Sequence, residues 1–383
     1  MKIAICMQCP LMQHGGVEVL VRELIKGLYR EFELYLISRD SVEGLVGTPY
    51  EAMLNGIFSY DPAANRCAQA RAMAEWGRKN GIELFHFHHG GTYGWGSRHF
   101  TGSIIPAVRR EGFRCVSTNH GAFGLLDCVG AQRSLAFKLA ALCLCWPAKI
   151  RQLAAVDWEA TVSQHDLEAV RRWFPPARKK FFKIYHSVLD GTDLGLVQKK
   201  NVVLCLGTVG YRKGQQYLVD AFGRIARDVP GWELVIAGKH AGDGTPDAVH
   251  EAIRTHDIAD RVKILQDVPD TLAGELLQTS AVFAMPSVAE GLGLSLQEAM
   301  FYGAACVGSS VGGITDMIID NQTGLLVPSR DPQALASALK CLINDQVLRE
   351  RLATSGKNWI ASLGMTRQEM CKRYTDLYRR ARL

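Results

Sequence analysis

The sequence predicts an α/β protein made of two similar halves, each with a parallel sheet that is covered by helices on both faces. Short apolar segments typical of buried strands alternate with longer segments whose apolar residues recur at helical spacing. This alternation pauses at 190–200, in a polar stretch that contains Asp-Gly-Thr-Asp and Gln-Lys-Lys, and then resumes. The length of 383 residues suits two or three domains, so we place a domain boundary in the pause.

The elements follow the same rhythm in both halves. The first half opens with a strand at 2–7, a break at Gly15-Gly16 and a helix at 17–29. Further strands are expected at 32–37, 83–87, 114–117 and 160–163. The second half repeats the pattern with strands at 202–206, 233–237, 262–265, 281–285 and 304–308, and with helices at 215–226, 246–256, 272–279 and 294–302.

Composition limits the partners of the chain. Lys and Arg number 44 against 38 Asp and Glu, and the resulting net charge of +6 is scattered along the chain. Such an excess suits phosphate ligands or an anionic membrane surface and requires no nucleic acid. The 11 cysteines without a secretory signal indicate a reducing compartment, and no segment has the roughly 20 apolar residues of a membrane span. We expect a cytoplasmic protein, with a peripheral position at the inner face of the membrane as a further hypothesis.

The most informative segment is 286–300, which follows an apolar strand and enters a helix. Gly291 and Gly293 allow a ligand to approach the backbone closely, and the amides at a helix N-terminus bind anions. Glu290 lies in the loop and Glu298 about one turn into the helix, so the two carboxylates can reach different parts of one extended ligand. A sugar, a diphosphate and a ribose fit this pattern. The alternative is a plain glycine turn with a surface glutamate at each end.

This segment resembles the sugar-donor region of the retaining glycosyltransferases of the GT-B fold, in particular the glycosyltransferase family 4 group. The resemblance continues through Gly303, Val311-Gly312-Gly313, Asp316 and 324–327. It implies two Rossmann-like domains that face each other across a cleft, with an acceptor-side domain at 1–190, a donor-binding domain at 191–362 and a helix at 363–383 that crosses back to the first domain.

The resemblance also implies roles for individual residues. Glu290 is expected to hold hydroxyls of the donor sugar, and Glu298 the ribose. The backbone amides of Gly291, Leu292 and Gly293 are expected to meet the diphosphate. Recognition of the base is expected to be largely by backbone, near Val268, so that the nucleotide itself is not specified.

A second segment, 206–214, agrees with this interpretation but departs from the family at one position. The family has an arginine where this chain has Thr208, whereas Lys213-Gly214 stands in its expected place. A departing diphosphate gains negative charge and needs cations near it. We therefore expect Lys213 to contact the diphosphate and Arg212 to replace the missing arginine. The alternative is that both cations form a solvated turn.

In the first half, Gly15 and Gly16 resemble the glycine loop that closes over the donor phosphates. Taken alone, two glycines before a helix indicate only a turn. The spaced G-x-G-x-x-G fingerprint is absent from the sequence, which counts against a nicotinamide dehydrogenase.

Histidines gather at the ends of two predicted strands, at His86, His88 and His89 and again at His120. The carboxyl ends of parallel strands form the ligand crevice of such sheets, and the resemblance gives His120 a catalytic position near the donor sugar. A metal site at His86 and His88 is not favoured, because no carboxylate partner accompanies them. Since the sequence also has no D-x-D pair, we predict a metal-independent reaction without a cofactor.

The apolar and basic stretch 133–151 carries a hypothesis about the acceptor. Arg133, Lys138, Lys149 and Arg151 suit anionic headgroups, and Trp146 suits a membrane interface. A lipid-linked or glycan acceptor and a peripheral membrane contact would follow. A buried helix of the first domain is an equal alternative.

These observations lead to one hypothesis and two alternatives. We expect a hexosyltransferase-type enzyme that moves a sugar from a nucleoside diphosphate sugar to an acceptor hydroxyl with retention, in synthesis of a cell-surface polysaccharide, lipopolysaccharide or glycolipid. His120, Glu290 and Lys213 are its candidate catalytic residues. A nucleotide-sugar epimerase or hydrolase of similar fold is the enzymatic alternative, and a non-enzymatic sugar or nucleotide sensor is the other.

Overall fold

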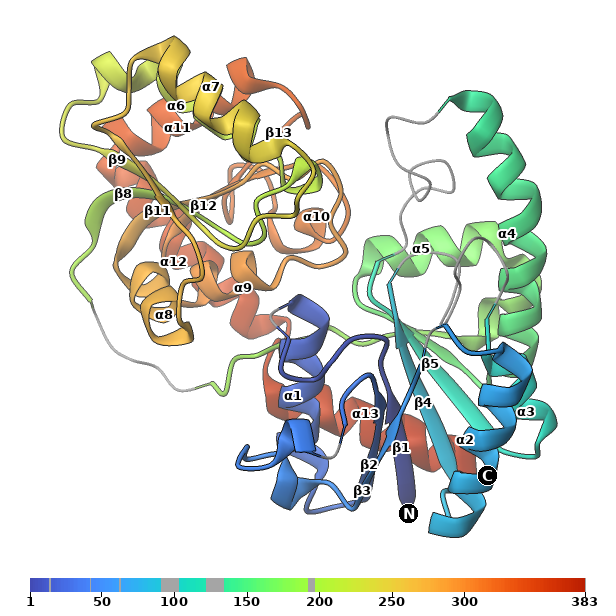
Figure 1. Ribbon diagram of the computed structural model, residues 1–383. Helices are drawn as coiled ribbons and strands as arrows, with labels where there is room; N and C mark the ends of the chain where they lie inside the picture. Colours follow the sequence, from blue (N-terminus) through green and yellow to red (C-terminus); the bar gives the residue numbers. More distant parts are fainter. Residues whose placement is uncertain are drawn as a thin grey trace. The chain divides into compact units, whose positions relative to one another are not determined.

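The computed structural model describes residues 1–13, 15–41, 43–61, 63–90, 103–121, 134–191 and 197–382. The chain divides into two compact units (Figure 1). Unit 1 comprises Met1–Asp190 together with Thr366–Leu383, and unit 2 comprises Gly191–Met365. Unit 1 is therefore completed by the end of the chain.

Unit 1 contains a parallel sheet whose described strands follow the order β3-β2-β1-β4-β5-β6-β7. The strands are β1 (Lys2–Cys6), β2 (Glu33–Ser38), β3 (Gly56–Ser59), β4 (Leu84–His89), β5 (Arg114–Asn119), β6 (Glu159–Thr161) and β7 (Phe181–Lys183). The helices are α1 (Gly16–Leu28), α2 (Arg66–Asn80), α3 (Ile105–Arg110), α4 (Leu135–Ala155), α5 (Gln164–Trp173) and α13 (Arg367–Arg382).

Helices cover both faces of this sheet because successive strand residues point to opposite sides. Ile3 and Ile5 of β1 belong to a core that also contains residues of α1 and α13. Ala4 and Cys6 belong to the opposite core, with residues of α2, α3 and α5. The C-terminal helix α13 is thus part of the hydrophobic core of unit 1.

Unit 2 repeats the architecture with strands in the order β10-β9-β8-β11-β12-β13, all parallel among the described residues. The strands are β8 (Lys200–Leu206), β9 (Glu233–Ala237), β10 (Val262–Leu265), β11 (Ser280–Met285), β12 (Ala305–Ser309) and β13 (Leu325–Val327). The helices are α6 (Gln215–Ile225), α7 (Thr245–His256), α8 (Asp270–Thr279), α9 (Leu294–Phe301), α10 (Ile314–Met317), α11 (Pro332–Asn344) and α12 (Gln346–Ser362).

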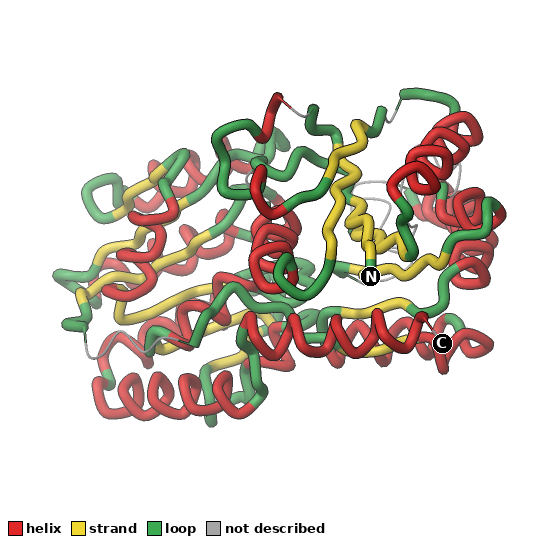
Figure 2. Tube along the Cα trace, turned by 90° about the horizontal axis from the view of Figure 1, so that it is seen from below, coloured by secondary structure: helices red, strands yellow, loops and turns green. Residues whose placement is uncertain are grey.

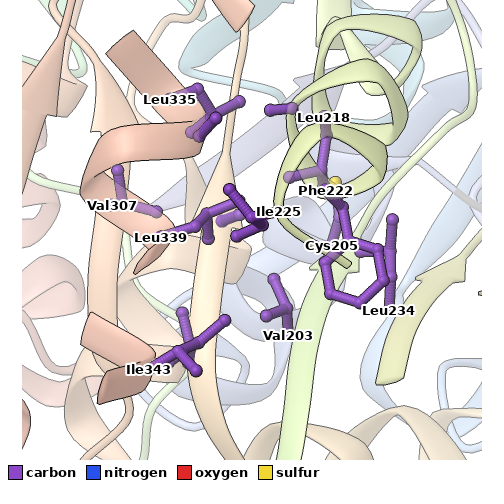
Figure 3. Packing of buried hydrophobic residues seen from close by; sticks show 14 of the residues in the cluster. Val203, Cys205, Leu218, Phe222, Ile225, Leu234, Val307, Leu335, Leu339 and Ile343 are labelled. Atoms are coloured by element: carbon purple, nitrogen blue, oxygen red, sulfur yellow. The ribbon is translucent and has the colours of Figure 1, made fainter. Parts of the chain in front are cut away.

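The core of unit 2 joins helices α6 and α11 to the sheet. Figure 3 shows Phe222 of α6 beside Cys205 of β8, and Leu339 of α11 beside Val307 of β12. Figure 2 shows the helices and strands of the described residues along the Cα trace. The predicted α/β architecture of two halves, each with a parallel sheet, is confirmed.

The differences from the prediction lie at the edges of the sheets. Strands β3, β7 and β13, of four, three and three residues, were not predicted. β3, β7 and β13 are also terminal in their sheets. A strand this short carries too few residues for an alternating pattern to stand out in a sequence.

Candidate active site

The first part of the site in unit 2 is the turn between β8 and α6. A single 3-10 turn, Tyr211–Lys213, ends at Gly214, whose φ of +72° favours glycine. A Cβ at Gly214 would lie 2.1 Å from the backbone oxygen of Pro286, in the loop after β11. The amide of Val288 in that loop donates to the carbonyl of Arg212 at 2.8 Å. The turn and the loop are therefore held together by backbone contacts that leave no room for a side chain at Gly214.

This contact brings both cations of the turn to one carboxylate. Lys213 Nζ lies 2.5 Å from Glu290 Oε2, and Arg212 Nη1 lies 3.7 Å from Glu290 Oε1. Ser287 Oγ donates to Glu290 Oε2 at 3.4 Å. The Glu290 side chain is 9% exposed, that of Lys213 17% and that of Arg212 50%. Three predicted site residues therefore form one charged cluster, which the sequence did not predict as a set of contacts.

The charge state of Glu290 follows from this cluster. Burial raises the pKa of the Glu290 carboxyl. Lys213, Arg212 and a hydrogen bond from the Gly291 amide lower this pKa by more than burial raises it, so the net shift is downward. Glu290 is a carboxylate at neutral pH. Two cations offset the charge of Glu290. A carboxylate paired in this way is better suited to orienting a ligand than to acting as a nucleophile.

The glycine loop after Glu290 packs against a second glycine pair. Gly293 caps α9 with a φ of +92°, and Leu292 beside it is buried. The amide of Gly313 donates to the carbonyl of Gly291 at 3.0 Å. A Cβ at Gly312 would lie 1.8 Å from the carbonyl oxygen of Glu290. Gly312 and Gly313 thus fix the backbone that carries the candidate site.

Glu298 lies in α9, whose first turn is tied to β8 by a hydrogen bond from Ser295 Oγ to the carbonyl of Leu206 at 2.9 Å. Burial, with a smaller contribution from the Asp270 carboxylate, raises the pKa of Glu298 to about 7. Glu298 therefore changes charge near neutrality, unlike Glu290.

The remaining predicted residues of unit 2, Thr208 and Val268, lie after the carboxyl ends of β8 and β10. Thr208 follows β8 and is exposed, and its carbonyl accepts a hydrogen bond from Gln215 Nε2 at 3.1 Å. Gln215 is fully buried and also accepts from the Gly210 amide. Val268 follows β10 and is partly buried. Gln215 and Ser287 were missed, because a side chain that supports a loop has no motif of its own.

In unit 1, the predicted glycine loop follows β1. Gly15 is the N-cap of α1 and Gly16 its first residue, and the amide of Val19 donates to the Gly15 carbonyl at 3.0 Å. A Cβ at Gly15 would lie 2.2 Å from a carboxylate oxygen of Glu18. The expected glycine turn before a helix is present.

The histidines of unit 1 form a cluster that includes one residue the sequence did not predict for it. His88 Nδ1 lies 3.0 Å from His120 Nε2. The His86 ring centroid lies 4.1 Å from that of His88, and the His186 centroid 5.1 Å from that of His120. His186 follows β7, and no signal in the sequence assigned it to this cluster.

These imidazoles are neutral at physiological pH. Burial is the largest cause, with neighbouring histidines adding to it, and it lowers the pKa of His86 and of His120 to about 3. The pKa values of His88 and His186 are also lowered for the same reasons. Within the described residues, no group of three or more His, Cys, Asp or Glu side chains is arranged to hold a metal ion.

His89 faces a different network, which corrects the expectation for Lys149. Lys149 Nζ lies 2.8 and 2.7 Å from the two carboxylate oxygens of Glu159, and His89 Nε2 lies 3.3 Å from the same carboxylate. All three side chains are almost fully buried. Burial raises the pKa of Glu159, but Lys149 and His89 hold it well below its usual range. Lys149 is therefore an internal ion-pair partner and does not face anionic headgroups.

The stretch 133–151 contains both packed and exposed side chains. Trp146 packs against Phe174, with ring centroids 5.7 Å apart. Leu139 and Ile150 of α4 are each 49% exposed, and Arg151 is also exposed. Arg133 and the side chain of Lys138 lie outside the part that the structure describes. No helix within the described ranges combines the length and the apolar character that a bilayer span requires.

Two family models match the chain, one in each unit. "Glycosyltransferase Family 4" matches residues 14–188 and "Glycosyl transferases group 1" matches residues 192–359. Each model covers less than half of the chain, but together the two extend over most of its length.

Relatives and solved structures agree with these models. The chain is 28% identical over 173 residues to a D-inositol 3-phosphate glycosyltransferase of Segniliparus rotundus, covering 45% of this chain and 38% of that protein. It is 27% identical over 215 residues to the lipopolysaccharide core biosynthesis mannosyltransferase LpsB of Rhizobium meliloti, covering 55% of this chain and 57% of that protein. The matched part thus spans about half of the length of these curated relatives.

A solved structure extends the comparison to the whole chain. The Anabaena Alr3699/HepE structure in complex with UDP and glucose superposes with a TM-score of 0.74 at 16% identity and covers 99% of both chains. At this identity the likeness concerns the fold. Each unit of the chain is thus matched by a glycosyltransferase family model, the Family 4 model in unit 1 and the group 1 model in unit 2, and the chain has the two-domain α/β fold of the GT-B type.

Proposed function

We propose that the protein transfers a sugar from a nucleoside diphosphate sugar to an acceptor hydroxyl, with retention at the anomeric carbon and without a metal ion. The observation that carries this proposal is the cluster of Lys213, Arg212 and Glu290 beside the glycine loop of α9. Two cations and loop amides suit a diphosphate, and a carboxylate next to them suits sugar hydroxyls. The UDP and glucose bound to the Anabaena protein are consistent with such a donor.

The cluster also supports a mechanism. Lys213 and Arg212 pair with Glu290, and a bound diphosphate would compete with this carboxylate for both cations. As the bond to the sugar breaks, negative charge grows on the leaving diphosphate, and cations already in position stabilise it. Because the charge of Glu290 is offset by cations, we favour a front-face route in which the donor phosphate accepts the proton of the acceptor hydroxyl.

Other predicted residues enter as parts of the same proposal. Glu298 would hold the ribose, Val268 would lie near the base, and the amides of Gly291, Leu292 and Gly293 would meet the diphosphate. His120 would contact the donor sugar, and Gly15 and Gly16 would close over the phosphates. These assignments rest on the resemblance of their segments to the family.

Arg212→Ala is expected to lower the rate by about ten- to a thousandfold with the fold intact. Arg212 lies 3.7 Å from the carboxylate that Lys213 also contacts, so it can supply the second cation that the family arginine, replaced here by Thr208, would provide. Each 1.36 kcal/mol of lost stabilisation is about tenfold in rate. Steady-state kinetics with Thr208→Arg added to this variant should recover part of the rate. Wild-type turnover of the single variant would show that Arg212 only faces solvent.

Donor affinity is expected to rise with pH, by up to about tenfold between pH 6 and pH 8. The pKa of Glu298 is raised to about 7, so the carboxyl is mostly neutral at pH 6 and mostly charged at pH 8, and only the charged form accepts hydrogen bonds from ribose hydroxyls at both oxygens. Calorimetric titration with an intact nucleotide sugar measures this, since its phosphates do not titrate in this range. In Glu298→Gln the affinity should be independent of pH, and an unchanged slope would exclude the assignment.

The proposed acceptor follows from the relatives and from exposed residues of α4. The names of the two relatives concern a lipopolysaccharide core and an inositol phosphate, and we propose a glycan or lipid-linked acceptor in synthesis of a cell-surface polysaccharide, lipopolysaccharide or glycolipid. The exposed Leu139, Ile150 and Arg151 of α4 support a peripheral membrane contact. Co-sedimentation with anionic vesicles should fall in Ile150→Glu but not in Val347→Glu, a control at an exposed apolar residue of α12. Equal binding of all three proteins would exclude this surface.

The experiment that tests the proposed function is a screen of radiolabelled nucleotide sugars for binding, followed by product analysis with and without acceptors. Transfer that depends on an acceptor, and that survives exhaustive chelation, is the expected result. Release of free sugar or an epimerised donor without an acceptor would indicate a hydrolase or epimerase. Binding without any turnover would indicate a sensor, and activity restored only by magnesium or manganese would contradict the metal-independent route.

A further inference from the structure

A chain of hydrogen bonds within unit 1 joins α13 to the histidine cluster. Tyr378 OH lies 2.7 Å from His86 Nδ1, and His86 Nε2 lies 2.8 Å from Thr118 Oγ1. Thr118 Oγ1 lies 2.9 Å from Tyr374 OH, which lies 2.7 Å from His186 Nε2. Tyr374 and Tyr378 are one helical turn apart and fully buried. Residues from β4, β5, the segment after β7 and α13 are thus linked by one continuous network.

The direction of this network follows from Tyr378. Its hydroxyl has His86 Nδ1 as its one hydrogen-bond partner in the part of unit 1 that the structure describes, and a buried hydroxyl that does not donate costs free energy. The Tyr378 hydroxyl therefore donates a hydrogen bond to His86 Nδ1. His86 then carries its own proton on Nε2, and this N–H donates to Thr118 Oγ1. Thr118 then donates to Tyr374. Tyr374 in turn donates to His186 Nε2, so that His186 carries its proton on Nδ1.

The His88–His120 pair packs against the two histidines of this network, His86 and His186. The His86 ring lies against His88 and the His186 ring against His120, with the centroid distances given above. His88 is 1% exposed, and among the described residues its Nε2 atom has no hydrogen-bond partner. Buried polar atoms of native proteins nearly always have a partner, so this nitrogen is suited to a group that is not part of the protein.

We propose that His88 Nε2 binds a sugar hydroxyl of the substrate, and that Tyr374 and Tyr378 of α13 are positioning residues that fix the tautomers of His86 and His186 and thereby hold the His88–His120 pair in place. The kinetic part of this inference rests on the proposed function, because it assumes that the reaction is a sugar transfer. The tautomers themselves do not depend on any activity. The hydroxyl belongs to the donor or to the acceptor sugar, and kinetics separate the two sources.

The test combines histidine NMR with kinetics on the full chain. Ring ¹⁵N-labelled histidine reports the protonated nitrogen of each imidazole, and we expect Nε2–H for His86 and Nδ1–H for His186 in the wild type. Tyr378→Phe should change the tautomer of His86, and Tyr374→Phe that of His186. Each variant should lower kcat about tenfold. His88→Gln should raise KM about tenfold for one substrate only, the one whose hydroxyl it binds.

A control on the same helix separates positioning from folding. Thr375 Oγ1 donates to Glu31 at 3.0 Å and lies outside the network, so Thr375→Val should leave both the tautomers and kcat unchanged. An Nδ1–H form of His86 in the wild type, or Tyr→Phe variants that behave like Thr375→Val, would overturn the positioning role. An unchanged KM for both substrates in His88→Gln would overturn the hydroxyl contact. If no sugar transfer is found at all, the proposed function fails while the NMR result still decides the tautomers.

Discussion

Lys213→Met is expected to lower kcat about a hundred- to a thousandfold. Lys213 is the cation closest to Glu290, at 2.5 Å, and the less exposed of the two at 17%, so it works in a site with little water. Removing one preorganised donor from such a site typically costs about 2.7–4 kcal/mol of transition-state stabilisation. Arg212 remains in this variant and accounts for residual activity. Single-turnover kinetics at saturating donor measures the loss without a contribution from product release.

Two further variants make this prediction specific. Lys213→Met leaves Glu290 with Arg212 as a neighbouring cation, and an underpaired buried carboxylate destabilises the fold. Lys213→Met with Glu290→Gln should therefore recover thermal stability but not activity. Lys340→Met, which breaks an exposed pair with Asp228 at 2.6 Å, should retain full kcat. Turnover of Lys213→Met within twofold of the wild type would remove Lys213 from the catalytic residues.

Lys149→Met is expected to reduce the free energy of unfolding of unit 1 by about 3–5 kcal/mol. The change removes the cation that contacts both oxygens of Glu159 at 2.8 and 2.7 Å, while the carboxylate stays fully buried. An unpaired buried charge costs far more than the net value of the pair. Urea unfolding followed by tryptophan fluorescence detects the loss, because Trp158 is next to Glu159 in the chain.

The double variant separates the charge from the packing. Lys149→Met with Glu159→Gln removes both charges and keeps an acceptor for Ser117 Oγ, which lies 2.9 Å from Glu159, so most of the stability should return. Lys2→Met, which breaks a partly exposed pair with Glu33 at 3.4 Å, should cost much less stability, because water screens an exposed ion pair. Equal losses in the buried and the exposed variants would show that the Lys149 pair has no special role.

Most of the architecture could be predicted because buried parallel strands are recognisable as apolar runs between helices. In unit 2, Lys213, Glu290 and Glu298 were named from the resemblance of their segments to the family, and their roles stay predictions. That Arg212 and Lys213 would reach the same carboxylate was not predictable. It depends on the tight packing of Gly214 against Pro286, which no spacing along the chain reveals.

The errors share another physical cause, contacts between residues far apart in the sequence. For Lys149 a membrane-facing position and a buried helix were equal alternatives, and the sequence could not decide between them because its ion-pair partner is on β6 and not on its own helix. Likewise, His186 reaches the histidine cluster through Tyr374, which lies 188 positions later. A sequence pattern describes the face of one helix or strand, and it does not show which charged or polar groups another element brings to that face.

The stereochemistry of transfer tests the central claim most directly. ¹H NMR of the anomeric proton of the transferred sugar distinguishes the two configurations when wild-type protein is supplied with its donor and acceptor, because the new glycosidic bond fixes the configuration. A product with the same anomeric configuration as the donor is the predicted result, with Lys213→Met giving the same product far more slowly. An inverted product would contradict the retaining, front-face mechanism that we propose for the Lys213, Arg212 and Glu290 cluster.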